Sequence, residues 1–387
     1  MIRSSSIARK RVAVLVYSTF QPGRDVLLGV AQLAQELDSW RLIHVPGGSA
    51  DSIPDWLDGS EIDGIIARIT SETMANALRA FNVPVVDVQR GVQVTDIPQV
   101  DIDDEAVTHL VAQYFFDREF RHIGFYPFEN NREGWSQRRC ESLRQLCAGR
   151  ASFHLYDALP ENRQGARATR HHVQAWLRSL PKPVAIMLAR DDGGLVVLDA
   201  CREVGLLVPE QVSVLGVDND RPLCDMTTPP LSSVRVGHRE VGYRAALLLD
   251  KRMAGDDLAE DLLLVPPLGI VTRRSSDAHA IHDENVANGV HYIHENLTQE
   301  ITNESLARIA GMSRTLFQQR FRHEMGKTIR NYVTDTRLGR AKALLTKSDL
   351  SLAEIAWRVG FKRQEYMGHV FKTRLGVTPG NLRKASR

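Results

Sequence analysis

The sequence predicts an α/β N-terminal part, built as two doubly wound parallel-sheet subdomains, followed by an all-α C-terminal domain. Short Val- and Ile-rich runs alternate with amphipathic helical patterns from about residue 10 to residue 273. After residue 284 only helical patterns remain. A chain of 387 residues is also longer than one hydrophobic core usually supports, so two or three folding units are expected.

The expected strands are short runs dominated by Val, Ile and Leu. Near-continuous apolar runs are typical of strands that are buried on both faces, as in a parallel sheet between helices. Parallel neighbours need helix-sized, right-handed crossovers, and ligands of such folds bind outside the carboxyl ends of the strands. The runs are Val12–Tyr17, Leu42–Val45, Gly64–Ala67, Val85–Val88, Ile123–Tyr126, Val184–Leu188 and Val212–Val217.

The segments between these runs have apolar residues at helical spacing, which predicts the crossover helices. Together with the strands they supply enough elements for two subdomains. The expected helices are Asp25–Leu37, Glu105–Phe116, Gln137–Ala148, Thr169–Leu180 and Leu195–Val204.

A polar stretch separates the two parts of the chain. Residues 274–283 lack apolar periodicity, which predicts a linker between a domain of residues 10–273 and one of residues 284–387. Residues 284–387 hold 18 Lys and Arg and 9 Asp and Glu. The rest of the chain holds 31 Lys and Arg and 38 Asp and Glu. A small basic domain joined to a larger acidic one is typical of a protein that binds a polyanion through one domain.

Two segments of the basic domain resemble each other at a spacing of about fifty residues. Each predicts a helix, a sharp turn and a second helix. Gly311 and Gly360 stand where the turn needs a positive φ, and Ala307 and Ala356 are small where two helices cross closely. The sequence therefore predicts two helix-turn-helix units in tandem.

Capping residues support the same boundaries. Ser313 is expected to cap the second helix of the first unit, and Ser351 with Glu354 has the spacing of a capping box for the second unit. Leu316, Phe317 and Phe321 are expected to pack inward from the second helix of the first unit.

The opposite faces of these helices carry side chains that reach base edges and phosphates in a major groove. Two such helices one DNA turn apart would read successive faces of one duplex, although exposed polar faces alone are also compatible with simple solvation. The candidate DNA-binding residues are Arg314, Thr315, Gln318, Gln319, Arg322, Lys362, Arg363, Gln364, Glu365 and His369.

The stretch from about residue 285 to residue 383 resembles the DNA-binding domain of the arabinose-regulator (AraC/XylS) family. The resemblance is carried by Leu306-Ala307, Phe321-Arg322, Ile355-Ala356, Val359-Gly360-Phe361, Phe371-Lys372, Gly376 and Thr378-Pro379. It implies two helix-turn-helix units joined by a long helix at about Thr328–Leu345. Met367 and Asn381-Leu382 depart from the family pattern, which affects packing and leaves the reading face intact.

The resemblance also implies how the candidate residues divide. Thr315, Gln318 and Gln319 would read bases in the first unit. Gln364, Glu365 and His369 would do so in the second unit. Arg314, Lys362 and Arg363 would hold phosphates.

Residues 10–273 are similar to the ligand-binding core of the lactose-repressor (LacI) and periplasmic sugar-binding superfamily. The similarity is carried by Asp63-Gly64-Ile65-Ile66, Pro84-Val85-Val86-Asp87-Val88, Val214-Leu215-Gly216-Val217-Asp218-Asn219, Leu231-Ser232-Ser233-Val234 and Gly242-Tyr243-Arg244-Ala245-Ala246. It implies a periplasmic-binding-protein-like sensor for a small effector, a sugar such as xylose or a related carbohydrate. Sugar sites use planar bidentate partners for vicinal hydroxyls. The candidate ligand-binding residues are Arg24, Asp87, Arg139, Arg190, Asp191, Asp218 and Asn219.

These observations predict an effector-responsive transcription regulator, expected to act as an activator. Its expected partners are double-stranded DNA, a sugar effector, RNA polymerase and a second copy of the chain. Two alternatives are a cytoplasmic sugar-binding protein and a sugar-modifying enzyme on a doubly wound fold. The enzyme lacks support because the sequence has no P-loop, dinucleotide fingerprint or nucleophile elbow, and we assign no catalytic residue.

The remaining expectations concern compartment and cofactors. The four cysteines form no C-x-x-C pair, so we expect no metal site, no cofactor and a reducing cytosol. Cys140 and Cys147 share one helical face and are expected in the core. The apolar run Val12–Val16 is shorter than a secretory signal requires, and no segment is long enough to span a membrane, so a cytoplasmic location is expected.

Overall fold

A computed structural model describes residues 9–45, 57, 61–92, 96–128, 133–157, 166–256 and 261–385 of the chain. It divides into two compact units. The first unit comprises Met1–Val204 with Ser213–Asp277, and the second comprises Gly205–Val212 with Ala278–Arg387. We call them the sensor unit and the helical unit and describe each by itself.

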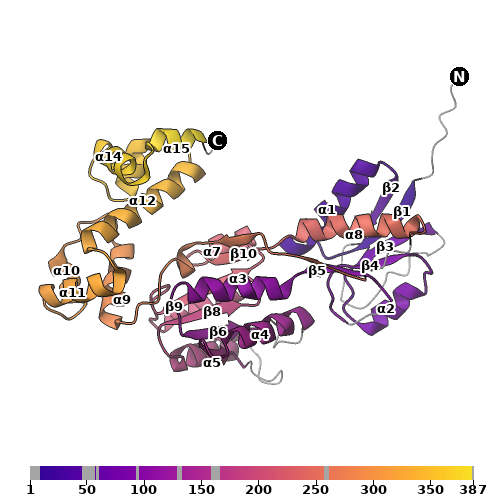
Figure 1. Cartoon of the computed structure of the whole chain (residues 1–387), viewed down its shortest axis with the longest axis horizontal. Helices are drawn as coiled ribbons and strands as arrows, with labels where there is room; N and C mark the ends of the chain where they lie inside the picture. The colour runs from indigo at the N-terminus through magenta and orange to yellow at the C-terminus, as the bar shows by residue number, and fades with distance from the viewer. Residues whose placement is uncertain are drawn as a thin grey trace. The chain divides into compact units, whose positions relative to one another are not determined.

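The sensor unit contains two lobes, each with a six-stranded sheet. The first sheet has the order β11-β5-β4-β3-β1-β2 and is parallel throughout. The helices α1 and α8 lie together on one face of it, and α2 lies on the other (Figure 1). The elements of the first lobe are β1 (Lys10–Leu15), α1 (Gln21–Leu37), β2 (Trp40–His44), β3 (Gly64–Ala67), α2 (Glu72–Arg79), β4 (Val85–Asp87), β5 (Gln99–Ile102), α8 (His238–Met253) and β11 (Leu262–Val265).

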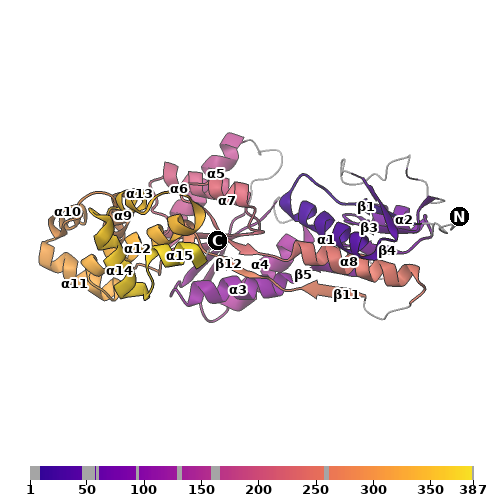
Figure 2. The same cartoon turned by 90° about the horizontal axis from the view of Figure 1, so that it is seen from above.

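The second sheet has the order β12-β10-β9-β8-β6-β7, in which β12 pairs antiparallel with β10. The helices α3 and α4 lie on one side of it and α5, α6 and α7 on the other (Figure 2). The elements of the second lobe are α3 (Asp104–Phe116), β6 (His122–Tyr126), α4 (Gly134–Cys147), β7 (Ser152–Leu155), α5 (Ala166–Ser179), β8 (Val184–Leu188), α6 (Gly193–Glu203), β9 (Val212–Val217), α7 (Arg221–Met226), β10 (Ser232–Arg235), β12 (Gly269–Val271) and the 3₁₀ helix Arg274–Ser276.

The predicted fold class is confirmed: each of the seven predicted strands overlaps a strand of these sheets. The structure adds β5, β7, β10, β11 and β12. Cys140 and Cys147 are buried, as expected. Among the described residues, no helix combines the length and apolar character that crossing a membrane requires.

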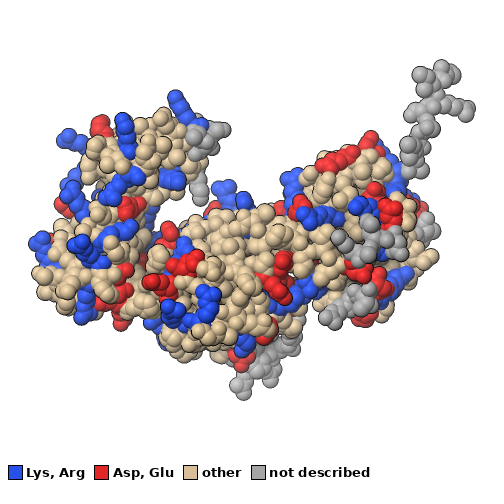
Figure 3. All heavy atoms as spheres, in the orientation of Figure 1, with Lys and Arg blue, Asp and Glu red and all other residues tan. Residues whose placement is uncertain are grey.

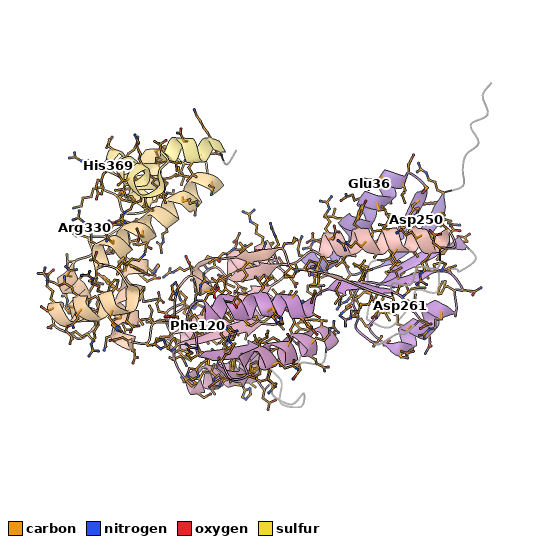
Figure 4. All side chains as sticks on the ribbon, in the orientation of Figure 1. Glu36, Phe120, Asp250, Asp261, Arg330 and His369 are labelled. Atoms are coloured by element: carbon orange, nitrogen blue, oxygen red, sulfur yellow. The ribbon has the colours of Figure 1, made fainter. Side chains whose placement is uncertain are left out.

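Close contact between α1 and α8 holds the first lobe together. A Cβ on Gly29 would lie 2.0 Å from the Arg239 carbonyl oxygen, and one on Gly242 would lie 2.0 Å from the Val26 carbonyl oxygen. Only glycine allows the two backbones to approach this closely. Side chains extend the contact, because the Tyr243 hydroxyl donates to Glu36 at 2.8 Å; Glu36 on α1 and Asp250 on α8 are labelled in Figure 4.

The chain passes between the lobes at three described connections: from β5 to α3, from β10 to α8, and from β11 to β12. Each connection spans only a few residues, so groups at its two ends lie on different lobes yet close together. Asp104 begins α3 and His238 begins α8, so both stand directly at a crossing.

The helical unit contains two small cores that share one long helix. Its elements are α9 (Glu284–Glu295), α10 (Asn303–Ile309), α11 (Arg314–Met325), α12 (Ile329–Lys347), α13 (Leu352–Arg358), α14 (Gln364–Leu375) and α15 (Pro379–Ala385). Ile329 and Val333 of α12 pack in the core of the first half, and Leu338 and Leu345 pack in that of the second half. The predicted long helix at about Thr328–Leu345 thus corresponds to α12.

The start of the predicted linker belongs to the sensor unit. Ser275 is fully buried: its hydroxyl donates to the Val214 carbonyl at 2.6 Å and accepts from the Ser232 amide at 2.8 Å. The division between the units falls between Asp277 and Ala278.

Candidate ligand cavity and nucleic-acid interface

A cavity lies between the two lobes of the sensor unit, at the carboxyl ends of both sheets. Aromatic rings, cations and carboxylates all face it. Rings suit the C–H faces of a small polar ligand, and the charged groups suit its hydroxyls. The lining residues are Val16, Tyr17, Phe20, Pro22, Gly23, Val26, Arg68, Val88, Gln89, Asp101, Ile102, Asp104, Trp135, Arg139, Arg190, Asp218 and His238.

A network of two arginines and two aspartates supports one wall, which Asp101, Asp104 and Arg139 line. Arg139 is buried; its Nε donates to Asp104 Oδ1 at 2.8 Å and its Nη1 donates to the Ala189 carbonyl at 2.7 Å. The other oxygen of Asp104 accepts from Arg138 Nε at 2.9 Å, and Arg138 also contacts Asp101 at 3.3 Å. Burial, and then the negative charge of Asp104, raise the pKa of Asp101 well above its usual value.

Asp218 and His238 connect the lobes across the cavity. Asp218 directly follows β9 and has φ 102°, a conformation in which non-glycine residues are strained and which is concentrated at functional sites. Its Oδ1 lies 3.2 Å from His238 Nε2. Burial raises the pKa of Asp218, but the hydrogen bond and charge of His238, with Arg139 and Arg190, outweigh burial and hold the pKa below its usual value.

Two further arginines face the cavity. The Arg190 guanidinium lies 4.6 Å from the Phe20 ring centroid and 4.4 Å from that of Phe128, and its Nη2 contacts Asp192 at 3.0 Å. Arg68 directly follows β3; its Nε donates to Gln89, and its guanidinium lies 5.1 Å from the Tyr17 ring centroid. These stacked planar cations are rigid hydrogen-bond donors.

Three of the seven predicted ligand residues line the cavity: Arg139, Arg190 and Asp218. The other four contact other groups of the sensor unit and do not line the cavity. Arg24 donates to the carbonyls of Ser18 and Thr19, and Asn219 accepts from Arg273 at 2.9 Å.

The two remaining predicted residues are buried carboxylates that bind backbone amides. Asp87 accepts from the amides of Ile69, Gln89 and Arg90 and from the Gln99 side chain. Asp191 accepts from the Asp220 amide at 2.7 Å and from Ser233 Oγ at 2.6 Å. Both carboxylates fix the loops that follow the strands and do not line the cavity.

Sequence reasoning missed Arg68, His238 and the aromatic residues Tyr17 and Trp135. Arg68 carried a usable signal, because it directly follows the apolar run Gly64–Ala67 at the carboxyl end of a strand. His238 had no such signal, since the sequence did not reveal β10 or the crossing that follows it.

The reading face predicted for the first helix-turn-helix is exposed on α11. Ser313 caps this helix by accepting from the Leu316 amide at 3.3 Å, and Gly311 has φ 62°. Phe317 and Phe321 are buried, but the expectation that Leu316 packs inward was wrong. Leu316 is 38% exposed, because it precedes Phe317 by one residue and therefore points about 100° away around the helix. The exposed residues are Arg314, Thr315, Gln318, Gln319 and Arg322.

The second helix-turn-helix repeats this arrangement on α13 and α14. The predicted capping box of Ser351 and Glu354 is present, and Gly360 has φ 91°. Met367, which departs from the family pattern, is fully buried in the second core. Figure 3 shows blue Lys and Arg side chains over the helical unit, and Figure 4 labels His369 on α14. The exposed candidates are Lys362, Arg363, Gln364, Glu365 and His369.

Arg337 of α12 links the two halves. Its Nε and Nη2 donate to the Leu297 carbonyl at 3.0 and 2.8 Å. The turn of the second helix-turn-helix approaches the same atom, since a Cβ on Gly360 would lie 1.9 Å from the Leu297 oxygen. The second turn is thereby fixed against the loop that follows α9.

Comparison with known proteins matches both units. Residues 112–276 match a family model described as a periplasmic binding protein-like domain, and residues 306–385 match a helix-turn-helix domain. The xylose operon regulatory protein of Escherichia coli strain K12 is 28% identical over 97% of each chain. The chain is a transcription regulator with a helix-turn-helix domain. The periplasmic binding protein-like match precedes the helix-turn-helix match along the chain.

Two more similarities support the assignment as a transcription regulator. The xylose operon regulatory protein of Haemophilus influenzae is 28% identical over 85% of this chain and 87% of its own. A solved structure described as a xylose-binding transcription activator matches with a TM-score of 0.82 and 26% identity, over 97% of this chain and 98% of that chain. The regulator thus belongs to a class of DNA-binding proteins and not to the enzymes that share doubly wound folds.

Proposed function

We propose that the regulator binds a monosaccharide in the cavity of the sensor unit and activates a carbohydrate catabolic operon in response. The relatives whose names mention xylose support xylose or a related carbohydrate as the effector. The regulator would act in the cytoplasm as a homodimer and contact RNA polymerase. The observation that carries the proposal is the position of Asp218 and His238, which join the two lobes inside the cavity.

This position supports gating by lobe closure. A sugar hydroxyl that hydrogen bonds to Asp218 from one lobe and to a donor on the other would favour one lobe arrangement. Arg68 and Gln89 line the cavity from the other lobe and can supply such a donor, whereas Arg139 and Arg190 belong to the lobe of Asp218 and lower its pKa. Trp135 and Phe20 would contact the apolar face of the ring.

DNA recognition would divide between the exposed residues of α11 and α14. Thr315, Gln318 and Gln319 would read bases with the first unit, and Gln364, Glu365 and His369 with the second. Arg314, Lys362 and Arg363 would hold phosphates, which give affinity without sequence preference. Arg314 also pairs with Glu304 at 2.7 Å, which orients its guanidinium beside the helix start.

A thermal-shift screen tests the sensor assignment, because a ligand that binds the folded state raises the melting temperature by mass action. The full chain is screened against pentoses, hexoses and sugar acids. Asp218→Asn is expected to lose the shift while keeping its DNA affinity without effector. Asp199 is a half-exposed carboxylate on α6 of the same lobe that pairs with Arg202. The Asp199→Asn variant is therefore the matched control and is expected to behave as the parent. Equal shifts for parent and Asp218→Asn would remove Asp218 from the site.

A further inference from the structure

Three arginines line the cavity, and they differ in how their charge is balanced. Arg139 pairs with Asp104, and Arg190 pairs with Asp192. Within the described part of the chain, no carboxylate forms an ion pair with Arg68. Its hydrogen bond goes to the neutral amide of Gln89, which in turn donates to Glu133 at 3.4 Å and so stands between the two charged groups.

The other acidic groups of the cavity are already engaged. Asp104 binds both Arg138 and Arg139, and Asp101 binds Arg138 and the Ile102 amide. Asp218 is engaged by His238.

Arg68 is also held near a like charge. Burial lowers the pKa of Arg68; Glu133, Tyr17 and Asp101 act in the opposite direction, and the positive charge of Arg190 lowers the pKa further. A guanidinium stays protonated in proteins, so the cavity keeps both positive charges. A partly buried cation without a counter-ion is costly, and an anion that binds it relieves the cost.

We propose that the effector is a monosaccharide that carries an oxyanion, a carboxylate or a phosphate, and that Arg68 binds this group with Arg190 beside it. This inference rests on the proposed function. Guanidinium forks bind carboxylates and phosphates through two parallel hydrogen bonds, which neutral hydroxyls do not match. Arg68 and Arg190 come from different lobes, so the oxyanion would connect the lobes as the sugar ring does. With a neutral sugar in the cavity, Arg68 would have no counter-ion among the residues that the structure describes.

Matched ligands test the charge requirement with the full-length chain. Galacturonate is compared with galactose and with methyl galacturonate, both of which keep the sugar ring and lack the negative charge. Glucose 6-phosphate is compared with glucose. Xylose is included as the neutral pentose. We expect one of the anions to raise the melting temperature well above its neutral counterpart. A shift by galacturonate identifies a carboxylate, and a shift by glucose 6-phosphate identifies a phosphate.

Variants then assign the charge to Arg68. Arg68→Gln is expected to weaken binding of the active anion on the order of tenfold or more, as is usual when a charged hydrogen bond is lost. Arg41→Gln, which removes an exposed arginine from β2 of the same lobe, is expected to leave it unchanged. Neutral sugars that bind as tightly as the anions, with Arg68→Gln binding like the parent, would overturn the inference and leave the sugar sensor standing. No response to any carbohydrate would overturn both.

Discussion

Buried carboxylates of the sensor unit fall into two groups according to what their oxygens contact. Asp87 and Asp191 accept hydrogen bonds from backbone amides of the loops that follow their strands. Asp104 and Asp218 contact Arg139 and His238 at the cavity. The first group fixes local backbone, and the second holds cavity groups in place. Loss of a member of each group should therefore have different consequences.

Asp87 should make stability depend on pH. Burial raises its pKa to about 6, so between about pH 4 and 6 the folded chain holds a proton that the unfolded chain has released. The free energy of unfolding therefore falls as pH rises through this window. In Asp87→Asn this contribution is absent, so the stability of the parent relative to the variant should fall by on the order of 2 kcal/mol between pH 4 and 7.

Urea unfolding of both chains at several pH values measures this difference. The Asp199→Asn chain is the control for the removal of one carboxylate from the same unit. A constant difference between parent and Asp87→Asn would contradict the assignment.

The direction of a side chain explains why the cavity was only partly predictable. The strand pattern placed Asp87, Asp191 and Asp218 at carboxyl ends of strands, and the structure agrees. Whether a carboxylate there turns toward the cavity or back to its own loop depends on which amides the loop presents. That depends on φ and ψ of residues such as Asp218 itself, which apolar periodicity does not encode.

The helices α11 and α14 should differ in what their residues contribute to DNA binding. Gln318→Ala should lose discrimination between operator and unrelated duplex by roughly 1–3 kcal/mol, because it removes a base contact. Lys362→Ala should weaken both duplexes alike and reduce the slope of log affinity against log salt by about 1. Fluorescence anisotropy over a range of salt concentrations measures both effects. If both variants bound every duplex as the parent does, the assignment of the reading faces would be wrong.

The two turn glycines offer a matched pair at the scale of the element. Both have positive φ, but a Cβ on Gly311 meets no atom within 4 Å, whereas one on Gly360 lies 1.9 Å from the Leu297 oxygen. Gly311→Ala should destabilise its unit by about 1–2 kcal/mol from the left-handed conformation alone. Gly360→Ala should cost clearly more, because the backbone must also move.

Hydrogen exchange followed by mass spectrometry localises the effect. Amides of α13 and α14 should lose protection in Gly360→Ala, and amides of α10 and α11 should lose less in Gly311→Ala. Exchange in the sensor unit is the internal control. Equal loss of protection in both variants would contradict the close contact at Leu297.

The helical elements were easier to predict than the edges of the sheets. Capping residues and turn glycines are local signals, so α10, α11, α13 and α14 followed from short motifs. The strands β11 and β12 are short and partly exposed, and they join two different sheets after one crossing. Their position depends on contacts with β5 and β10, which are distant in sequence, and no local pattern reports such contacts.

At the scale of the whole molecule, charge separates the two activities along the chain. The helical domain is basic and the rest of the chain is acidic, so attraction to DNA is concentrated in residues 284–387. The net negative charge of residues 1–283 disfavours contact of the sensor with the phosphate backbone. If the effector binds in the cavity and DNA binds the helices, the effector can control DNA binding only by favouring conformations of the chain that differ in affinity for DNA.

Reciprocal coupling is the prediction that follows. If the effector changes affinity for the operator by some factor, the operator must change affinity for the effector by the same factor, with 5- to 150-fold typical of allosteric proteins. Anisotropy with and without effector gives one factor, and calorimetry with and without duplex gives the other. Asp218→Asn should remove both, whereas Asp199→Asn should keep both. An effector affinity that stays the same on saturation with operator would mean that cavity and helices are uncoupled, and gating by ligand would have to be rejected.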